Sequence, residues 1–255
     1  MNTIQKILQS KTLERLRRQV GKTTGLHLRL KRFTPSASEE MRTAMLLQHM
    51  NVDFVIDIGA NTGQFAESLY DFGYTGQVVS FEPVGAVHQH LQKRSESYPN
   101  WTVAERCAIG DQDGETEINV SNDTVFSSVL EIEDSYVSHN PKSKIVAKEK
   151  INLYKIDTIL PKYLPAKNSG ILLKIDTQGF EKEVLDGAPA TLAKAKGLKI
   201  EIPLYPIYRN THFEFYDIID FVKKQGFQPY SFHVEGVDLT TGRVNTIDGL
   251  FFRDQ

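Results

Sequence analysis

Four residues near position 60 have the types and the spacing of a nucleoside-binding turn. Asp57 and Gly59 close a short apolar run, Gly63 follows four residues later, and Glu82 ends the next run. A glycine lets the backbone bend tightly and approach a ligand without a Cβ. A carboxylate at Asp57 suits a cationic amine, directly or through water, and one at Glu82 suits the two hydroxyls of an adenosine ribose. The pattern predicts a cofactor that combines an amine with an adenosine.

The spacing of this turn separates two classes of cofactor. A dinucleotide site has the pattern G-x-G-x-x-G, whose middle glycine lets a pyrophosphate approach a helix N-terminus. Asn61 occupies that middle position here, so we do not expect a pyrophosphate-containing ligand. S-adenosylmethionine, which carries an ammonium and a sulfonium, fits the pattern better. The alternative reading of each acid is structural: Asp57 caps a turn, and Glu82 is a surface acid before a proline.

Three further acids stand where a reaction could take place. Asp176 follows one apolar run, Glu201 lies near the end of another, and Asp248 precedes the last. Methyl transfer from a sulfonium is a displacement, and a hydroxyl acceptor must also lose its proton, to a general base or with help from a metal ion. The three carboxylates could hold Mg²⁺, which prefers oxygen ligands, or act as a base and its hydrogen-bonded supports. Both interpretations stay open, and His212 is the best-placed histidine for the role of base.

An alternation of short apolar runs and segments of helical period positions these residues. It predicts an α/β fold with a parallel sheet covered by helices. We expect strands at residues 54–58, 77–81, 102–109, 115–120, 151–154, 170–175 and 198–202, and an antiparallel pair at 227–234 and 249–252. We expect helices at 63–72, 84–97, 157–163, 180–196 with a break at Gly187 and Pro189, and 213–224. The run 121–144 is polar, weakly periodic and long for a connection, which is typical of a lid or a substrate loop.

Length, charge and cysteine content limit the functional classes. A chain of 255 residues suits one α/β domain with an N-terminal extension. The net charge is −2, and no basic stripe is interleaved with aromatic residues, so we expect no nucleic-acid partner. The single cysteine, Cys107, excludes an internal disulfide and a cysteine-based zinc site. No apolar run reaches the ~18 residues of a membrane span, and no signal-peptide pattern is present, so we expect a cytoplasmic protein.

The N-terminal segment 1–32 is strongly basic, with Glu14 as its one acid. Its basic residues are Lys6, Lys11, Arg15, Arg17, Arg18, Lys22, Arg29, Lys31 and Arg32. Apolar residues give the segment a loose helical stripe. Such a helix could contact an anionic membrane surface or a partner protein, or pack across the main domain with its basic face in solvent; we favour the latter.

Several blocks of the chain together resemble the FkbM family of methyltransferases. They are Asp57 to Phe65, Phe81-Glu82-Pro83, Ala108-Ile-Gly-Asp111 and Lys174-Ile-Asp-Thr-Gln-Gly-Phe-Glu181. The block that starts at Ile175 is the most diagnostic, and the resemblance spans about residue 50 to the C-terminus. It implies a Rossmann-like methyltransferase fold, with a mostly parallel seven-stranded sheet and helices on both faces. We therefore expect a basic helical extension at residues 1–50 and a methyltransferase domain at 51–255.

The resemblance also implies roles for individual residues. The amino-acid part of the cofactor would be surrounded by Asp57, Gly59, Ala60, Asn61 and Gly63. Glu82 would bind the ribose, Ala108 and Ile109 would lie near the adenine, and Asp176 would face the methyl-transfer site. Ser127, Ser128 and Tyr208 are the candidate acceptor-binding residues.

The turn and its acids favour S-adenosylmethionine, and the resemblance implies methylation of a hydroxyl. Together they predict an S-adenosylmethionine-dependent O-methyltransferase that acts on a hydroxyl of a sugar, a glycan or a related small molecule. Methylation of a polyketide, a peptide or a nitrogen centre is the nearest alternative. A non-catalytic adenosine-binding subunit of a glycan assembly complex is another. Formation of a homo-oligomer stays open.

Overall fold

The computed structural model describes residues 23, 34–165, 170–209, 211 and 213–254. The chain divides into two compact units, residues 1–42 and 43–255, so the division expected after residue 50 stays a prediction. The basic segment 1–32, apart from residue 23, lies outside the described residues, and so does His212. The first element with described bounds is α3 (Glu39–His49). Among the described residues, no helix combines the length and the apolar character that a membrane crossing requires.

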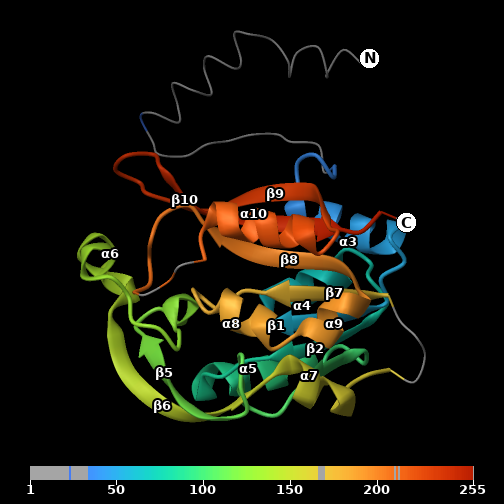
Figure 1. Cartoon of the computed structure of the whole chain (residues 1–255), viewed down its shortest axis with the longest axis horizontal. Helices are drawn as coiled ribbons and strands as arrows, with labels where there is room; N and C mark the ends of the chain where they lie inside the picture. Colours follow the sequence, from blue (N-terminus) through green and yellow to red (C-terminus); the bar gives the residue numbers. More distant parts are fainter. Residues whose placement is uncertain (1–22, 24–33, 166–169, 210, 212, 255) are drawn as a thin grey trace. The chain divides into compact units, whose positions relative to one another are not determined.

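A seven-stranded sheet forms the centre of the second unit, in the order β3-β2-β1-β7-β8-β10-β9 (Figure 1). Its strands are β1 (Phe54–Ile58), β2 (Gln77–Phe81), β3 (Trp101–Val103), β7 (Ile171–Ile175), β8 (Ala195–Pro203), β9 (Gln228–Val237) and β10 (Val244–Phe252). The first five strands in this order run parallel, and β10 is antiparallel to both of its neighbours. The predicted mostly parallel sheet with an antiparallel last pair is therefore confirmed. Because the strand order reverses at β1, the carboxyl ends of β1, β2 and β7 form the place where such sheets bind ligands.

Helices cover both faces of this sheet. Successive residues of a strand point to opposite faces, so an apolar strand presents side chains to the helices on each face. Ile56 packs in the cluster that holds buried residues of α7, α8, α9 and α10, whereas Val55 packs in the cluster that holds α4 and α5. The helices are α4 (Gln64–Asp71), α5 (Gly85–Ser95), α7 (Ile156–Ile159), α8 (Glu181–Asp186), α9 (Pro189–Lys194) and α10 (Phe215–Lys224). The break expected in the helix at 180–196 separates α8 from α9, and Pro189 occupies the first turn of α9.

A second sheet of three strands has the order β4-β6-β5. Its strands are β4 (Ala108–Ile109), β5 (Gly114–Ser121) and β6 (Ile145–Tyr154). The prediction of a single strand at 102–109 is therefore wrong, because its first residues belong to β3 of the large sheet and its last to β4 of the second sheet. The Ala104 amide still donates to Ser80 of β2, but the Ala104 carbonyl is hydrogen-bonded to the His88 ring at 2.9 Å. That carbonyl cannot extend the ladder, and the chain leaves the large sheet there.

The connection between β5 and β6, residues 122–144, is more ordered than its polar sequence indicates. It contains η1 (Thr124–Phe126), α6 (Asp134–His139) and η2 (Pro141–Ser143), and we refer to it as the β5–β6 segment. Its Ile132 packs with Ile207 and Tyr208 and forms an isolated bridge with Tyr208. Asp134 also pairs with Arg209, at 2.5 Å. The segment is thus docked on the chain that leaves β8.

Candidate active site

The turn after β1 is held between the ends of β2 and β7. Gly59 has φ +73°, and a Cβ on this residue would lie 1.8 Å from the Asp176 carbonyl oxygen. Only glycine fits there, because the close approach and the left-handed backbone both exclude a side chain. The amides of Gly59 and Ala60 both donate to the Phe81 carbonyl, at 3.0 Å each. The turn is therefore fixed on both sides by backbone contacts.

Glu82 lies just beyond β2 with its carboxylate directed back toward this turn. It is 5% exposed and accepts hydrogen bonds from the backbone amides of Asn61 and Val84, at 2.8 Å each. Burial raises the pKa of Glu82 to about 7, although the two hydrogen bonds from the backbone amides lower it in part. The alternative reading of Glu82 as a surface acid is wrong. Its carboxylate is buried and held in place beside the turn.

Asp57 has an internal cationic partner that the sequence interpretation missed. Its side chain is fully buried, and its Oδ1 atom lies 2.9 Å from the Lys174 ammonium. Ser80 donates to the other carboxylate oxygen at 3.1 Å. Lys174 also donates to the Gly59 carbonyl at 2.9 Å and lies 3.6 Å from Asp176 Oδ2. Lys174 therefore joins the middle of β1, the turn after β1 and the end of β7.

The charge of Lys174 follows from these contacts. Burial by itself lowers the pKa of this ammonium, but the carboxylates of Asp57 and Asp176 outweigh burial and raise it. A lysine within the apolar run at 171–175 is a sequence signal for such a pair, because a fully buried lysine needs a carboxylate partner.

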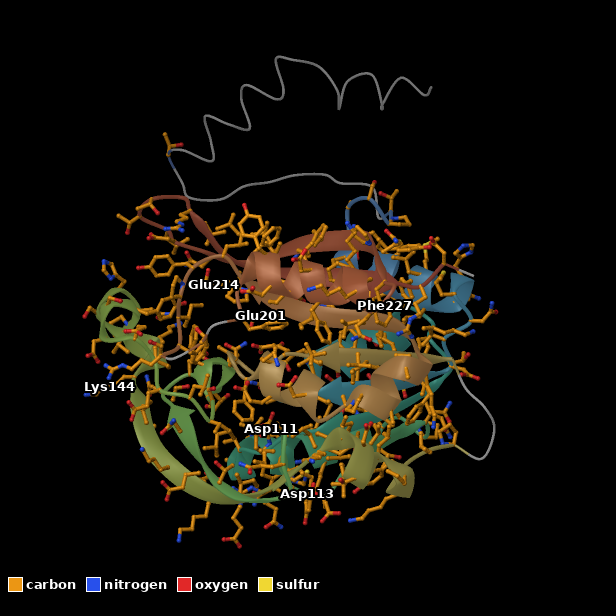
Figure 2. All side chains as sticks on the ribbon, viewed as in Figure 1. Asp111, Asp113, Lys144, Glu201, Glu214 and Phe227 are labelled. Atoms are coloured by element: carbon orange, nitrogen blue, oxygen red, sulfur yellow. The ribbon has the colours of Figure 1, made fainter. Side chains whose placement is uncertain are left out.

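Asp176 and Glu201 come together at the ends of the neighbouring strands β7 and β8, as the sequence predicts; Glu201 is labelled in Figure 2. The Gln178 side-chain amide donates to Asp176 Oδ1 at 2.7 Å and to Glu201 Oε2 at 2.9 Å. The Tyr208 hydroxyl donates to Gln178 Oε1 at 2.8 Å. Gln178 was also missed, because nothing in the sequence pattern shows that an amide lies between the two acids.

Burial and mutual repulsion shift the acids at this end of the sheet. The pKa of Glu201 is raised well above its ordinary value by burial and by the neighbouring carboxylates of Asp176 and Glu181. Burial likewise raises the pKa of Glu181 to about 7, although this carboxylate accepts hydrogen bonds from the amides of Thr177 and Gly179. Such shifts in adjacent acids are typical of sites that transfer protons.

The three candidate acceptor-binding residues use their hydroxyls within the protein. Ser127 accepts from the amide of Ser121, the last residue of β5, at 3.1 Å. Ser128 is buried and donates to the Gln178 backbone carbonyl at 2.7 Å, and Tyr208 is 5% exposed. Ser128 and Tyr208 therefore support Gln178, and contact of any of the three with an acceptor stays a prediction.

The three carboxylates suggested as a Mg²⁺ site do not fit one. Asp248 is paired with Lys199, whose Nζ atom lies against the Asp248 carboxylate. The other two, Asp176 and Glu201, both bind the Gln178 amide. Within the described part of the chain, these three acids are not grouped at ligand distance of one another.

Ala108 and Ile109 form β4 and are buried, at 5% and 3% exposure. They lie in the second sheet, paired with β6, and not at the end of a third strand of the large sheet as expected. Their role near an adenine stays a prediction.

A family model described as the methyltransferase FkbM domain matches residues 57–229. No curated protein matches the chain significantly. The similar solved structures include magnesium protoporphyrin IX methyltransferase from Synechocystis PCC 6803 with bound SAM, at 11% identity and a TM-score of 0.46, covering 98% of this chain and 95% of that one. TehB from Haemophilus influenzae has 11% identity and a TM-score of 0.46, covering 93% of this chain and 67% of that one. Precorrin-6y C5,15-methyltransferase from Geobacter metallireducens has 10% identity and a TM-score of 0.44, covering 85% and 87%.

Proposed function

Because the chain belongs to the FkbM family of methyltransferases, we propose that it transfers the methyl group of S-adenosylmethionine to a hydroxyl oxygen of a sugar, a glycan or a related small molecule. The observation that carries this proposal is the carboxylate pair Asp176–Glu201, joined by one amide, beside the turn after β1. A hydroxyl needs a base at the moment of transfer, and this pair supplies one.

The residues around the turn fit S-adenosylmethionine. Gly59 brings the backbone within reach of a ligand, and the buried Glu82 carboxylate is already oriented by two amides, so it can accept both ribose hydroxyls without reorganisation. The residues from Gly59 to Gly63 would hold the amino-acid part of the cofactor. Asp57 contributes through Lys174, since its own oxygens are engaged in the interior. When bound, S-adenosylmethionine supplies an electrophilic methyl group attached to a sulfonium.

Asp176 is the side chain that we assign to the acceptor. Its side chain is 38% exposed, whereas that of Lys174 beside it is 7% exposed. With S-adenosylmethionine bound, the acceptor oxygen would take the methyl carbon in place of sulfur, which would keep the electron pair of the carbon–sulfur bond. Asp176 would accept the proton of the hydroxyl. General base catalysis of this kind typically contributes ~10²–10⁴-fold, and alignment of the reacting atoms up to ~7–11 kcal/mol.

The acceptor class follows from the polar character of this edge. Asp176 and Glu201 place carboxylate oxygens, which accept from hydroxyl donors, on either side of one amide, and this arrangement suits a polyhydroxylated molecule. A neutral amine attacks through its nitrogen lone pair without first losing a proton, and the ammonium product releases its proton to water, so an amine acceptor has less need of a carboxylate.

Methyl transfer from labelled S-adenosylmethionine to sugar, oligosaccharide and amine acceptors tests the proposal. We expect a hydroxyl acceptor to be methylated, and Asp176→Asn to lower kcat by about 100-fold with the Kd for S-adenosylmethionine within about twofold. Asp220→Asn, which neutralises an exposed acid on α10, is the control and keeps full activity. Preferential methylation of an amine, or full activity of Asp176→Asn, would contradict the proposal.

A further inference from the structure

Gln178 has a backbone conformation that its side-chain contacts explain. Its φ is +58°, in the left-handed region that a non-glycine residue seldom adopts, and Gly179 follows at +94°. Such a conformation persists only where the surroundings hold it. Here they do, because the conformation directs the Gln178 side chain between two carboxylates and toward a phenol.

The Tyr208 hydroxyl determines which way the Gln178 amide points. An amide has two donors on its nitrogen and acceptor capacity on its oxygen. Because the phenol donates to Oε1, the nitrogen must face the two acids and can give one hydrogen to each. In the opposite orientation the amide oxygen would face two carboxylates, which repel it when ionised.

The same residue is tied to the β5–β6 segment through its backbone. Ser128 donates to the Gln178 carbonyl at 2.7 Å, and a Cβ on Gly179 would lie 2.8 Å from the Tyr208 ring. Tyr208 belongs in turn to the cluster that packs against Ile132 of that segment. Displacement of the segment would therefore move both the backbone and the amide of Gln178.

We propose that Gln178 is a positioning residue for methyl transfer: its amide holds Asp176 and Glu201 in one arrangement, and leaves Asp176 Oδ2 as the oxygen that accepts the acceptor's proton. This inference rests on the proposed function. Asp176 Oδ1 is occupied by the amide, and Oδ2 lies 3.6 Å from Lys174 Nζ, which stabilises its charge before transfer. Without the amide, the two acids would repel each other with nothing between them.

Several charged or titratable groups surround the Asp176–Glu201 pair and interact electrostatically with Glu201. The carboxylates of Glu181 and Glu235 raise the pKa of Glu201, and the Lys174 ammonium lowers it. The phenols of Tyr136 and Tyr208 also interact electrostatically with Glu201. Gln178 is the neutral donor that bridges the two acids. Its loss should raise the pKa of Glu201 further, because hydrogen bonds to an ionised carboxylate favour that form.

Two variants of Gln178 test this inference, each measured beside Gln92→Glu. Gln178→Asn keeps an amide and suits a left-handed backbone, but it is one methylene too short to bridge the acids. Gln178→Glu keeps the length and places a third carboxylate between them. Gln92→Glu adds the same charge at an exposed site on α5. Calorimetry with S-adenosylmethionine first establishes that each variant is folded and binds the cofactor.

Two readouts then follow: the pH dependence of kcat with the methylated acceptor, and carboxyl ¹³C NMR titration without acceptor. We expect Gln178→Asn to lower kcat by about tenfold or more with little change in the cofactor Kd. We expect Gln178→Glu to move the acidic limb of the profile to higher pH by about one unit, with a matching upward shift in the NMR titration. Gln92→Glu should leave both readouts unchanged.

The inference would be overturned if both Gln178 variants had the kcat, the pH profile and the carboxyl titration of the wild-type protein. If Gln178→Glu does not fold, Tyr208→Phe takes its place: it releases the amide oxygen and should produce a smaller shift in the same direction, and no shift overturns the inference. If no protein transfers methyl groups to any acceptor, the proposed function fails, and the NMR titration still decides whether Gln178 organises the pair.

Discussion

At the scale of single residues, the account depends on buried polar groups whose partners lie far away in the sequence. Lys174 and Asp57 are the clearest pair, with side-chain exposures of 7% and 0%. Taking both charges out of water is costly, and their attraction offsets the cost only while both are present. Such a pair is weak evidence for stability but strong evidence that the geometry around it is required.

We predict that Lys174→Met destabilises the protein by about 3–5 kcal/mol, because it leaves the Asp57 carboxylate buried without its cation. Adding Asp57→Asn should recover much of this loss, since no charge then remains in the interior. Denaturant unfolding of the single and double variants measures both values. If the single and the double variant had the same free energy of unfolding, Lys174 would contribute through packing and not through its ion pair with Asp57.

Gly59 and Gly73 provide a matched test of the turn after β1. Both have positive φ, +73° and +85°, but an added Cβ meets the Asp176 carbonyl at residue 59 and nothing within 4 Å at residue 73. Gly73→Ala should cost about 1 kcal/mol of stability from backbone strain alone. Gly59→Ala should in addition weaken binding of S-adenosylmethionine by about tenfold or more, because it pushes the turn away from β7. Calorimetry on both variants checks this, and similar affinities would argue against the placement of the cofactor.

The raised pKa of Glu82 makes cofactor binding pH-dependent. Burial raises this pKa from 4.5 to about 7, so the contribution of Glu82 to folding stability is complete below pH 4.5 and is lost as the pH rises through 7. Ribose hydroxyls donate to the ionised form, so binding should tighten over the same rise in pH and release a proton. Calorimetry in buffers of different ionisation enthalpy measures that proton. Glu82→Gln should abolish the proton release; if release persists, another group carries the linkage.

At the scale of elements, the sequence predicts best where a segment's own pattern decides its structure. The buried strands β1, β2 and β7 are mostly apolar runs, each with one or two polar or charged residues, and they form where the pattern predicts. The strand expected at 102–109 divides because the His88 ring is hydrogen-bonded to the Ala104 carbonyl, and no local pattern contains that contact. The helices of the β5–β6 segment are likewise stabilised by packing on residues 207–209, more than 60 positions away by sequence numbering.

The candidate site follows the same rule. Asp57, Gly59, Glu82 and Asp176 could be named from their positions after apolar runs. Lys174 and Gln178 acquire their importance only when the fold brings an acid to each of them.

We predict that the β5–β6 segment affects the acceptor and not the cofactor. Ile132→Ala removes the buried contact with Ile207 and Tyr208, and should raise the KM for the acceptor by about tenfold with an unchanged Kd for S-adenosylmethionine. Val125→Ala, at an exposed position of the same segment, is the control. Steady-state kinetics measure the KM for the acceptor, and calorimetry measures the Kd for S-adenosylmethionine. An equal loss of affinity for S-adenosylmethionine would contradict the prediction that the segment affects only the acceptor.

At the scale of the whole molecule, one edge of the seven-stranded sheet collects groups from the carboxyl ends of four strands. The turns after β1 and β2 bring Gly59 and Glu82, and the ends of β7 and β8 bring Asp176 and Glu201. The parallel core makes this convergence inevitable, because the carboxyl ends of its strands lie together. The roles of the basic segment 1–32, in membrane or partner contact or in packing, stay predictions.

A crystal structure with S-adenosylhomocysteine tests the central claim most directly. The account predicts ribose hydroxyls within hydrogen-bond distance of the Glu82 carboxylate, the amino-acid part along residues 59–63, and the sulfur facing Asp176. A ligand bound elsewhere, or bound with its sulfur directed away from the Asp176–Glu201 pair, would contradict it.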